Sequence, residues 1–286
     1  MTDLPVEGEN DVLSAADLAR FSDFLYRRTG MLFRENKRYY IDRRIADRMA
    51  ALGTASFSDY FAILRGVPDE LEMLINVFTV NETYFYREER HFACLSEHLL
   101  PAIAKGRTPG DKIRIWALPC STGEEAYSIA IWLLEHWPMV DAYHVEIIGS
   151  DINTRALAEA VEGDYGERAL AKLPPKLIAD YFEPEQGGNR RLIQDLRESV
   201  IFTPANLIDA STLAPQGRFD VILCRNVLIY FDDAARVTAL KNLYDRLVPG
   251  GYLILGHTES MAKVYDNFRT RRFGDVMVYQ RPETRR

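Results

Sequence analysis

The chain has 286 residues, of which 47% are hydrophobic and 27% are charged, so it can form one large domain or two smaller ones with a real core. Its net charge of -7 argues against a general nucleic-acid binder, and no apolar run approaches the roughly 18 residues that a membrane span requires. The first eleven residues are polar and acidic without a signal-peptide pattern, so we expect a cytoplasmic protein with no direct membrane insertion.

The first half of the chain has the pattern of consecutive helices. Capping residues and helical spacing of apolar residues predict helices from Ser14 to Gly30, from about Asn36 to Leu52 and from Ser56 to Gly66, and a fourth that starts at Pro68. We expect a flexible tail at 1–13, a helical domain at 14–80, and a linker with a helix at 81–110.

From residue 111 onward, short apolar runs alternate with helical stretches. This alternation predicts an α/β domain at 111–286 with a mostly parallel, doubly wound sheet. The expected strands are Ile113–Leu118, Val145–Gly149, Val200–Thr203, Phe219–Cys224 and Tyr252–Gly256, with an antiparallel edge pair at Phe268–Arg271 and Val276–Tyr279. The stretch 164–199 interrupts the alternation and is interpreted as a small inserted subdomain; the alternative is a long helical connection.

Polar residues after the first expected strand indicate the kind of cofactor. The turn Pro119–Glu125 has one glycine, so the GxGxxG dinucleotide fingerprint is absent. Its two carboxylates, Glu124 and Glu125, would repel a phosphate and suit a cationic ligand. This pattern argues against a nicotinamide cofactor and favours S-adenosylmethionine. The three cysteines and five histidines show no metal-ligand spacing, so we expect no bound metal.

The ends of the later strands carry further candidate ligands, because parallel strands bind ligands at their carboxyl ends. Asp151 can accept hydrogen bonds from ribose hydroxyls, although an Asp there is also a common helix cap. Asn206 and Leu207 can read and cover an adenine. The run 224–231 forms either the floor of an active site or an ordinary capped loop, and 247–252 is a structural turn whose glycines allow positive φ.

Four segments in this order resemble the chemotaxis receptor methyltransferases (CheR family). They are Thr79–Arg87, Cys120–Tyr127, Cys224–Phe231 and Gly256–Ser260, and the resemblance covers nearly the whole chain. It implies a class I methyltransferase-like fold with an all-helical N-terminal domain and an inserted subdomain. It also implies transfer of a methyl group from S-adenosylmethionine to glutamate side chains of chemoreceptors, giving methyl esters and S-adenosylhomocysteine.

The resemblance implies a role for each matching residue. Glu125 faces the methionine part of the cofactor, Asp151 the ribose, and Tyr230 stands near the transferred methyl beside Arg87. The remaining implied cofactor contacts are Asn81, Thr83, Arg87, Asn206, Leu207, Cys224 and Arg225. From the residues alone, Arg87 would instead form a surface ion pair with Glu88 or Glu89, and Tyr230 would be a core aromatic residue next to Phe231. A glutamate substrate is ionised at neutral pH, so no general base is required.

A basic stretch at 27–48 contains eight basic and three acidic residues in an otherwise acidic chain. Helical spacing places Lys37, Arg44 and Arg48 on one face, which we interpret as a docking surface for the glutamate-rich helical bundle of a chemoreceptor; the alternative is an ordinary solvated face. The loop Glu183–Arg191 is short, so we expect weak or absent tethering to a receptor C-terminal peptide.

Three other functions fit parts of the pattern. A methyltransferase of the same fold could act on RNA or a small molecule, with the basic helix binding phosphates. Separately, a receptor methyltransferase could serve a sensory array other than chemotaxis. A non-catalytic domain could sense S-adenosylmethionine, although Arg87 and Tyr230 argue against this. A nicotinamide oxidoreductase is disfavoured by the missing glycines.

Overall fold

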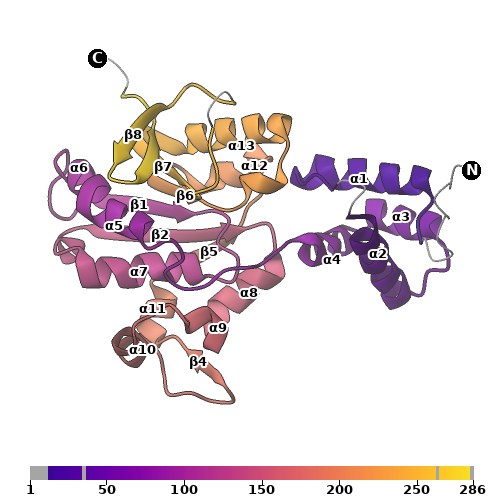
Figure 1. The fold of residues 1–286 in the computed structure, drawn as a ribbon, viewed down its shortest axis with the longest axis horizontal. Helices are drawn as coiled ribbons and strands as arrows, with labels where there is room; N and C mark the ends of the chain where they lie inside the picture. Colours follow the sequence, from indigo (N-terminus) through magenta and orange to yellow (C-terminus); the bar gives the residue numbers. More distant parts are fainter. Residues whose placement is uncertain (1–11, 34–36, 262–263, 284–286) are drawn as a thin grey trace, which may run out of the picture. The chain divides into compact units, whose positions relative to one another are not determined.

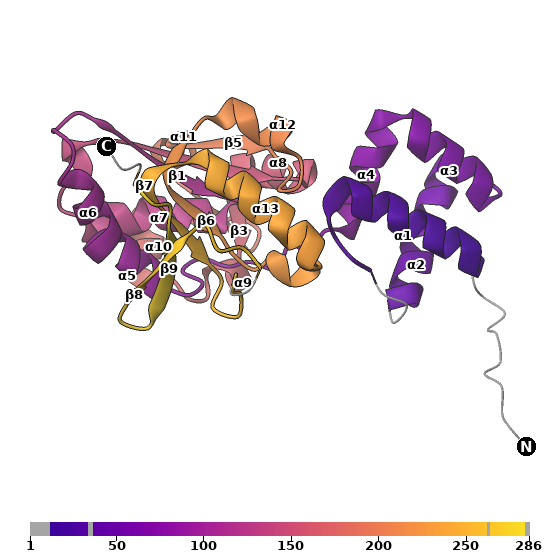
Figure 2. The ribbon, with the colours of Figure 1, turned by 90° about the horizontal axis from the view of Figure 1, so that it is seen from above.

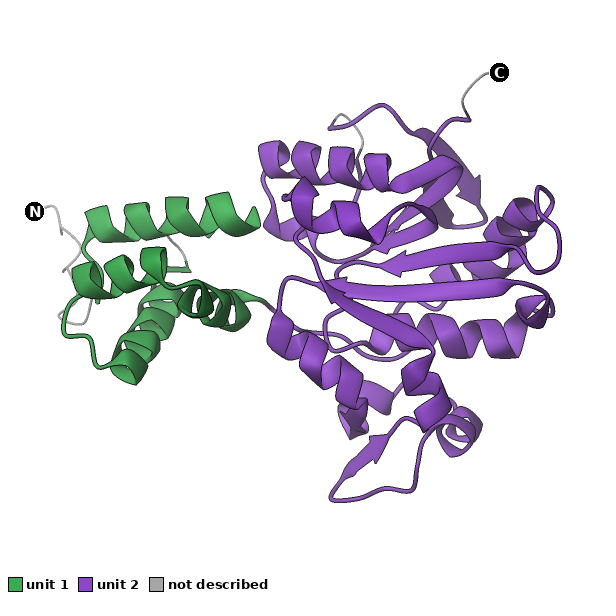
Figure 3. Cartoon of the chain, turned by 180° about the vertical axis from the view of Figure 1, so that it is seen from behind, with its two compact units in different colours: residues 1–79 green, residues 80–286 purple. Residues whose placement is uncertain are grey.

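The computed structural model describes residues 12–33, 37–261 and 264–283, and the expected tail falls mostly outside them. The chain separates into two compact units, Met1–Thr79 and Val80–Arg286 (Figure 3). No helix in the described part of the chain is long and apolar enough to cross a membrane.

The first unit is built from helices, as the sequence predicts (Figure 2). They are α1 (Ala15–Thr29), α2 (Arg38–Leu52), α3 (Phe57–Gly66) and α4 (Pro68–Phe78). Ser14 caps α1 by accepting the Asp17 N–H at 3.1 Å, and Gly30 ends it in the left-handed conformation. Ser56 caps α3 in the same way. The expected boundaries of these helices are therefore confirmed within one residue, apart from the expected start of α2 near Asn36, which lies outside the described residues.

Aromatic residues fill the core of the first unit. Phe21 of α1 contacts Phe78 of α4 with ring centroids 5.4 Å apart, and Phe57 and Tyr60 of α3 are also buried. Ile45 of α2 completes this cluster. A helix of ten to fifteen residues is marginal alone, so this shared apolar core holds the four together.

The second unit contains a seven-stranded sheet in the order β5-β2-β1-β6-β7-β9-β8 (Figure 1). Its strands are β1 (Lys112–Ala117), β2 (His144–Asp151), β5 (Val200–Pro204), β6 (Phe219–Cys224), β7 (Leu247–Leu255), β8 (Arg269–Phe273) and β9 (Val276–Gln280). The first five in this order run parallel, and β9 and β8 add an antiparallel edge. The expected doubly wound α/β fold is confirmed. Along the chain, the sheet is extended first from β1 through β2 to β5 and then from the other side of β1 through β6 to β7, so β1 is the point where the strand order switches direction.

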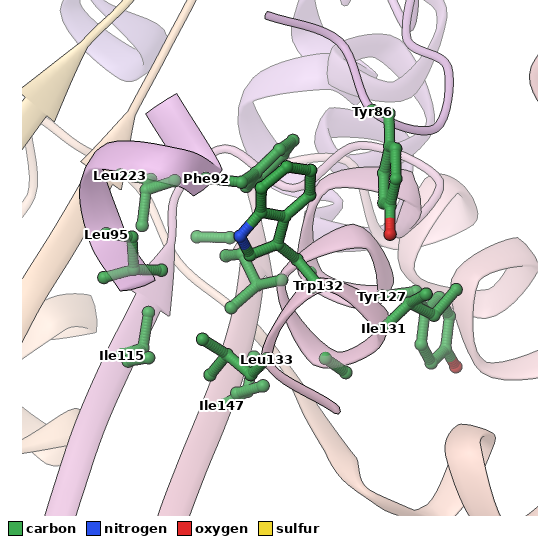
Figure 4. Close-up of a cluster of buried hydrophobic side chains, with 14 of the residues drawn as sticks. Tyr86, Phe92, Leu95, Ile115, Tyr127, Ile131, Trp132, Leu133, Ile147 and Leu223 are labelled. Atoms are coloured by element: carbon green, nitrogen blue, oxygen red, sulfur yellow. The ribbon is translucent and has the colours of Figure 1, made fainter. Parts of the chain in front are cut away.

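Helices cover the sheet with large apolar side chains. Trp132 of α7 (Glu124–His136) packs against Phe92 of α5 (Arg90–Cys94), with ring centroids 6.1 Å apart, in the same buried cluster as Ile115 and Leu223 of the sheet (Figure 4). Trp116 points to the opposite face, because side chains alternate along a strand, and stacks on Phe219 at 4.4 Å. Three further helices lie between strands of the sheet: α8 (Thr154–Glu162), α12 (Ala210–Leu213) and α13 (Asp233–Arg246). Before β1, α5 is followed by a π-helical turn (Leu95–Leu99) and by α6 (Leu100–Ala104).

The segment between α8 and β5 forms a small structure of its own. It contains β3 (Asp164–Gly166), α9 (Glu167–Leu170), α10 (Pro175–Tyr181), β4 (Asn189–Arg191) and α11 (Gln194–Glu198). The strands β3 and β4 pair antiparallel, Asp164 opposite Arg191, apart from the main sheet.

One expected turn is partly strand. The run 247–252 belongs to β7, which starts at Leu247 and shifts register against β6 before Tyr252. Gly250 has the positive φ expected of it, at 84°. The glycines therefore create an irregularity within a strand rather than a separate turn.

Candidate active site

The carboxyl ends of the parallel strands carry most of the candidate site residues. Asp151 is the last residue of β2, Cys224 is the last of β6, and Arg225 follows it directly. Glu125 lies in the first turn of α7, after β1. The topology therefore brings these residues to one edge of the sheet, beside the β1 switch point where open α/β sheets bind ligands.

Asp151 organises the turn after β1. Its Oδ2 accepts the backbone N–H of Ser121 at 2.8 Å, and its Oδ1 accepts that of Asn153 at 2.9 Å. Burial raises the pKa of Asp151, and these hydrogen bonds oppose the rise. Gly123 has a φ of 94°, and a side chain there would collide with Ala160, so the turn requires glycine. Asp151 thus shapes the turn, and its oxygens retain lone pairs for a ligand.

Arg225 connects three parts of the site from a buried position, with 1% of its side chain exposed. Its Nη1 donates to Glu125 Oε2 at 2.5 Å, and its Nη2 donates to the carbonyl of Arg87 at 2.6 Å. Nη2 also lies 3.3 Å from Glu88 Oε2. Arg225 therefore joins the end of β6 to α7 and to the segment that precedes α5.

The segment around Arg87 has an unusual backbone held by several contacts. Tyr86 and Glu88 both have φ near 60°, an uncommon conformation for residues other than glycine. The Phe85 N–H donates to the carbonyl of Ala169 at 3.0 Å, and the Tyr86 N–H donates to Ser128 Oγ at 3.0 Å. Such strain persists only where surrounding contacts determine it, and it concentrates at functional sites.

The Arg87 side chain does not form the surface ion pair that the residues alone suggested. Its Nη1 donates to the carbonyl of Glu82 at 2.7 Å, and its guanidinium lies 5.9 Å from the Tyr84 ring centre. Asn81 and Thr83 line a surface hollow of about 450 Å³ in this segment. Arg168 lines it as well and pairs with Glu82 at 2.8 Å.

Tyr230 stands on a short 3-10 turn, Leu228–Tyr230, and keeps 38% of its surface exposed. Burial raises the pKa of its phenol, and the nearby charge of Arg87 opposes that rise. The hydroxyl therefore stays protonated at neutral pH and can donate a hydrogen bond. Tyr230 is not a fully buried core residue, and its place beside Arg87 at the transferred methyl stays a prediction.

Glu259 holds the loop that carries Tyr230, a contact that the sequence did not reveal. Its Oε2 accepts the N–H groups of Asn226 and Gly256 at 2.7 and 2.8 Å, and its Oε1 accepts that of Leu228 at 2.7 Å. The motif 256–260 indicated this segment but not its contact with the loop after β6, because Asn226 and Leu228 lie 33 and 31 positions away in the sequence.

The other candidate cofactor residues differ in how they are presented. Cys224 is fully buried and paired in the sheet, so its side chain does not reach solvent. The Asn206 Oδ1 accepts the N–H of Ile208 at 3.2 Å, and the Leu207 carbonyl accepts Asn242 Nδ2 at 2.8 Å. These two residues lie in the loop after β5, where the sequence placed them.

The three candidate docking residues of α2 are not equivalent. Lys37 is exposed at the start of α2. Arg44 instead donates to the carbonyl of Val77 at 2.6 Å, and Arg48 forms a two-pronged ion pair with Glu70, with only 15% of its side chain exposed. The expectation that all three present free charge is therefore corrected, because Arg44 and Arg48 are used inside the helical unit.

Several buried polar atoms at the sheet edge lack a hydrogen-bond partner within the described chain. They include Glu125 Oε1, Ser121 Oγ and Arg225 Nε. An unpaired buried acceptor is costly, so native structures usually satisfy it with a ligand or water. Glu125 Oε1 lies at the carboxyl ends of the parallel strands, and an unpartnered carboxylate oxygen there suits the ammonium group of an amino acid. The residues present therefore fit the amino-acid end of S-adenosylmethionine.

Family models match both units of the chain. The model described as CheR methyltransferase, all-alpha domain, matches residues 16–79, and the model described as CheR methyltransferase, SAM binding domain, matches residues 81–276. The chain belongs to the CheR methyltransferase family. It is an S-adenosylmethionine-dependent methyltransferase, its sheet is of the class I methyltransferase type, and the resemblance seen in the sequence is confirmed.

Curated relatives span nearly the same length. Chemotaxis protein methyltransferase 2 of Vibrio cholerae is 43% identical over 273 residues, covering 95% of this chain and 94% of that protein. The chemotaxis protein methyltransferase of Escherichia coli is 33% identical, covering 92% and 91%. Among solved structures, N-methyltransferase NodS from Bradyrhizobium japonicum with S-adenosyl-L-homocysteine is 15% identical, with a TM-score of 0.38, and covers 73% of this chain and 93% of that one.

Proposed function

We propose that this CheR-family enzyme methylates glutamate side-chain carboxylates on the cytoplasmic helical bundle of chemoreceptors. The products are glutamate methyl esters and S-adenosylhomocysteine. The observation that carries the proposal is the match of both units to the two domains of one family whose curated members are chemotaxis protein methyltransferases. A SAM-binding domain alone would fit many substrates.

Each candidate residue is assigned to one part of the bound S-adenosylmethionine. Glu125 holds the ammonium of the methionine part, because its Oε1 is buried and unpartnered within the described chain. Asp151 receives the ribose hydroxyls. The remaining contacts are assigned to Asn81, Thr83 and Arg87 before α5, Asn206 and Leu207 after β5, and Cys224 and Arg225 at the end of β6. Cys224 contributes through its backbone, since its side chain is buried.

The reaction requires orientation more than acid–base chemistry. When bound, S-adenosylmethionine supplies a methyl group on a sulfonium that leaves as a neutral thioether. The substrate carboxylate, with an ordinary pKa of about 4.3, is already a nucleophile at neutral pH. Arg87 and Tyr230 direct one of its oxygens toward the methyl carbon, as a cation and a hydrogen-bond donor. Such alignment lowers barriers by roughly 7–11 kcal/mol.

Docking of the receptor is assigned to the basic face of α2. Lys37 is its exposed member among the three candidates, whereas Arg44 and Arg48 support the helix from within the unit. Complementary charge between this face and a glutamate-rich bundle raises the association rate. The short Glu183–Arg191 loop favours direct docking over tethering to a receptor C-terminal peptide.

A transfer assay separates this function from its main alternative. Labelled S-adenosylmethionine is incubated with the enzyme and either receptor-containing membranes or RNA. We expect label on receptor protein that is released by base, because methyl esters hydrolyse readily and methylated amines do not. Label on RNA would overturn the proposal, and so would base-stable label on protein.

A further inference from the structure

Glu88 gathers three nitrogen-bearing side chains around one carboxylate. Its Oε1 lies 2.5 Å from His257 Nδ1, and its Oε2 lies 3.1 Å from His91 Nδ1 and 3.3 Å from Arg225 Nη2. These partners come from α5, from the residue after β6 and from the loop after β7. Only 10% of the Glu88 side chain is exposed. No motif in the sequence suggested this cluster.

The cluster stays charged at neutral pH. Burial would raise the pKa of Glu88, but the Arg225 charge and the His257 hydrogen bond outweigh it and lower that pKa to about 2. Burial and the charge of Arg225 lower the pKa of His91 to about 4, so His91 is neutral. Arg225 contacts two carboxylates, those of Glu88 and Glu125. Counted by themselves, the side chains of Glu88, Glu125 and Arg225 carry two negative charges and one positive charge, while burial raises the pKa of Glu125 and the charge of Arg87 lies close enough to oppose that rise.

This charge balance has a consequence for Glu125. A guanidinium paired with Glu125 alone would neutralise it, and a neutral pair attracts a cation weakly. With Glu88 also contacting Arg225, the group retains a negative charge beside the unpartnered Glu125 Oε1. Interactions between charges are strong at such a poorly hydrated site.

We propose that Glu88 is a positioning residue that keeps the Glu88–Arg225–Glu125 cluster negative and thereby favours the cationic cofactor over its neutral product. S-adenosylmethionine carries a sulfonium charge that S-adenosylhomocysteine lacks, while both carry the same amino-acid end. The cluster therefore strengthens binding of the substrate form more than binding of the product form. This inference rests on the proposed contact between Glu125 and the cofactor.

A purely structural role for Glu88 predicts a different result. Its φ of 59° and its contacts also hold the backbone next to Arg87, so its loss could loosen the whole site. A loosened site would weaken both ligands by the same factor, because they share all parts but the methyl group. The ratio of the two affinities therefore reports the electrostatic role.

The test measures both affinities by calorimetry in the full-length protein and in Glu88→Gln. Glutamine keeps the size and removes the charge. Work at pH 8 lies well above the range in which histidine ordinarily titrates. We expect S-adenosylmethionine to bind about tenfold more weakly, and S-adenosylhomocysteine to lose about threefold or less.

Glu89→Gln is the matched control. Glu89 is the next residue, is exposed, and makes no side-chain cap hydrogen bond to α5. The Glu89→Gln substitution removes one negative charge that does not contact Arg225. We therefore expect the affinities for S-adenosylmethionine and S-adenosylhomocysteine to stay within about twofold, because exposed charges interact weakly. Unchanged affinities in Glu88→Gln, or equal losses for both ligands, would overturn the inference. Because no receptor is present, these results do not depend on the proposed methyl acceptor.

Discussion

Glu259 Oε1 accepts the backbone N–H of Leu228 at 2.7 Å, two residues before Tyr230. The same carboxylate holds the N–H groups of Asn226 and Gly256, so one side chain joins the loops that follow β6 and β7. Hydrogen bonds to a charged acceptor are worth about 1.5–3 kcal/mol each, and a carboxylate suits several donors because it presents only acceptors.

Replacing Glu259 should therefore impair the chemical step. In Glu259→Gln the amide NH₂ faces a donor instead of accepting from it, which releases the turn that carries Tyr230. We expect kcat to fall at least about tenfold while the KM for S-adenosylmethionine changes less. Steady-state kinetics measure both, and Thr258→Ala, an exposed neighbour, serves as control. A normal kcat in Glu259→Gln would show that the loop is held by other contacts.

Tyr230→Phe tests the hydroxyl directly. If the phenol steers the carboxylate, its removal should lower kcat at least about tenfold, since the loss of one preorganised hydrogen-bond donor can cost about 10²–10³-fold. Cofactor affinity, measured by calorimetry, should stay near the wild-type value because the ring remains. Unchanged turnover would remove Tyr230 from the mechanism.

Cofactor affinity should depend on pH through Glu125. Burial raises its pKa above the ordinary 4.5, opposed by the Arg225 charge, and a bound cation favours the ionised form. Below the raised pKa the carboxyl is neutral and binding must expel its proton, so affinity falls as pH decreases, by up to about tenfold per pH unit. Titrations between pH 8 and 5 measure this, and Glu125→Gln should bind weakly with a flatter profile. An equally steep profile in that variant would assign the proton to another group.

The ion pair between Arg48 and Glu70 should contribute to stability rather than to docking. Tyr60 also donates to Glu70 Oε1 at 2.9 Å, so the Glu70 carboxylate is buried among its partners. Arg48→Ala leaves it without a counter-charge, at a cost of about 3–5 kcal/mol in the free energy of unfolding. Denaturant unfolding of the full chain measures the loss, and Lys37→Ala should leave stability within about 0.5 kcal/mol.

Docking can be separated from stability with the same control residue. Because Lys37 is exposed on α2, Lys37→Ala should slow association with receptor-containing membranes, most visibly at low salt. Surface binding kinetics at two salt concentrations provide the measurement. Association that is insensitive to both salt and Lys37 would count against this face as the docking surface.

Local signals in the sequence were sufficient for most of the secondary structure. Ser14 and Gly30 bound α1 because a cap acts on groups within a few residues of itself. The alternation of strands and helices predicted the parallel sheet, which in turn placed Asp151 and Arg225 at its carboxyl edge. Neither inference needs knowledge of which distant residues touch.

The ion-pair partners of the charged side chains could not be predicted from the sequence. Near neighbours in the sequence suggested that Arg87 pairs with Glu88, yet Glu88 contacts Arg225, 137 positions away, and His257, 169 positions away. The sequence suggested that Arg48 presents its charge at the surface, whereas in the structure it forms an ion pair with Glu70 of α4. The helix caps and the carboxyl ends of the parallel strands were thus determined largely by the sequence alone, since short-range backbone geometry decides them, whereas the start of β7 at Leu247 was not. Only the tertiary structure decided which charges meet, because burial and proximity between remote segments arise from packing of the whole unit.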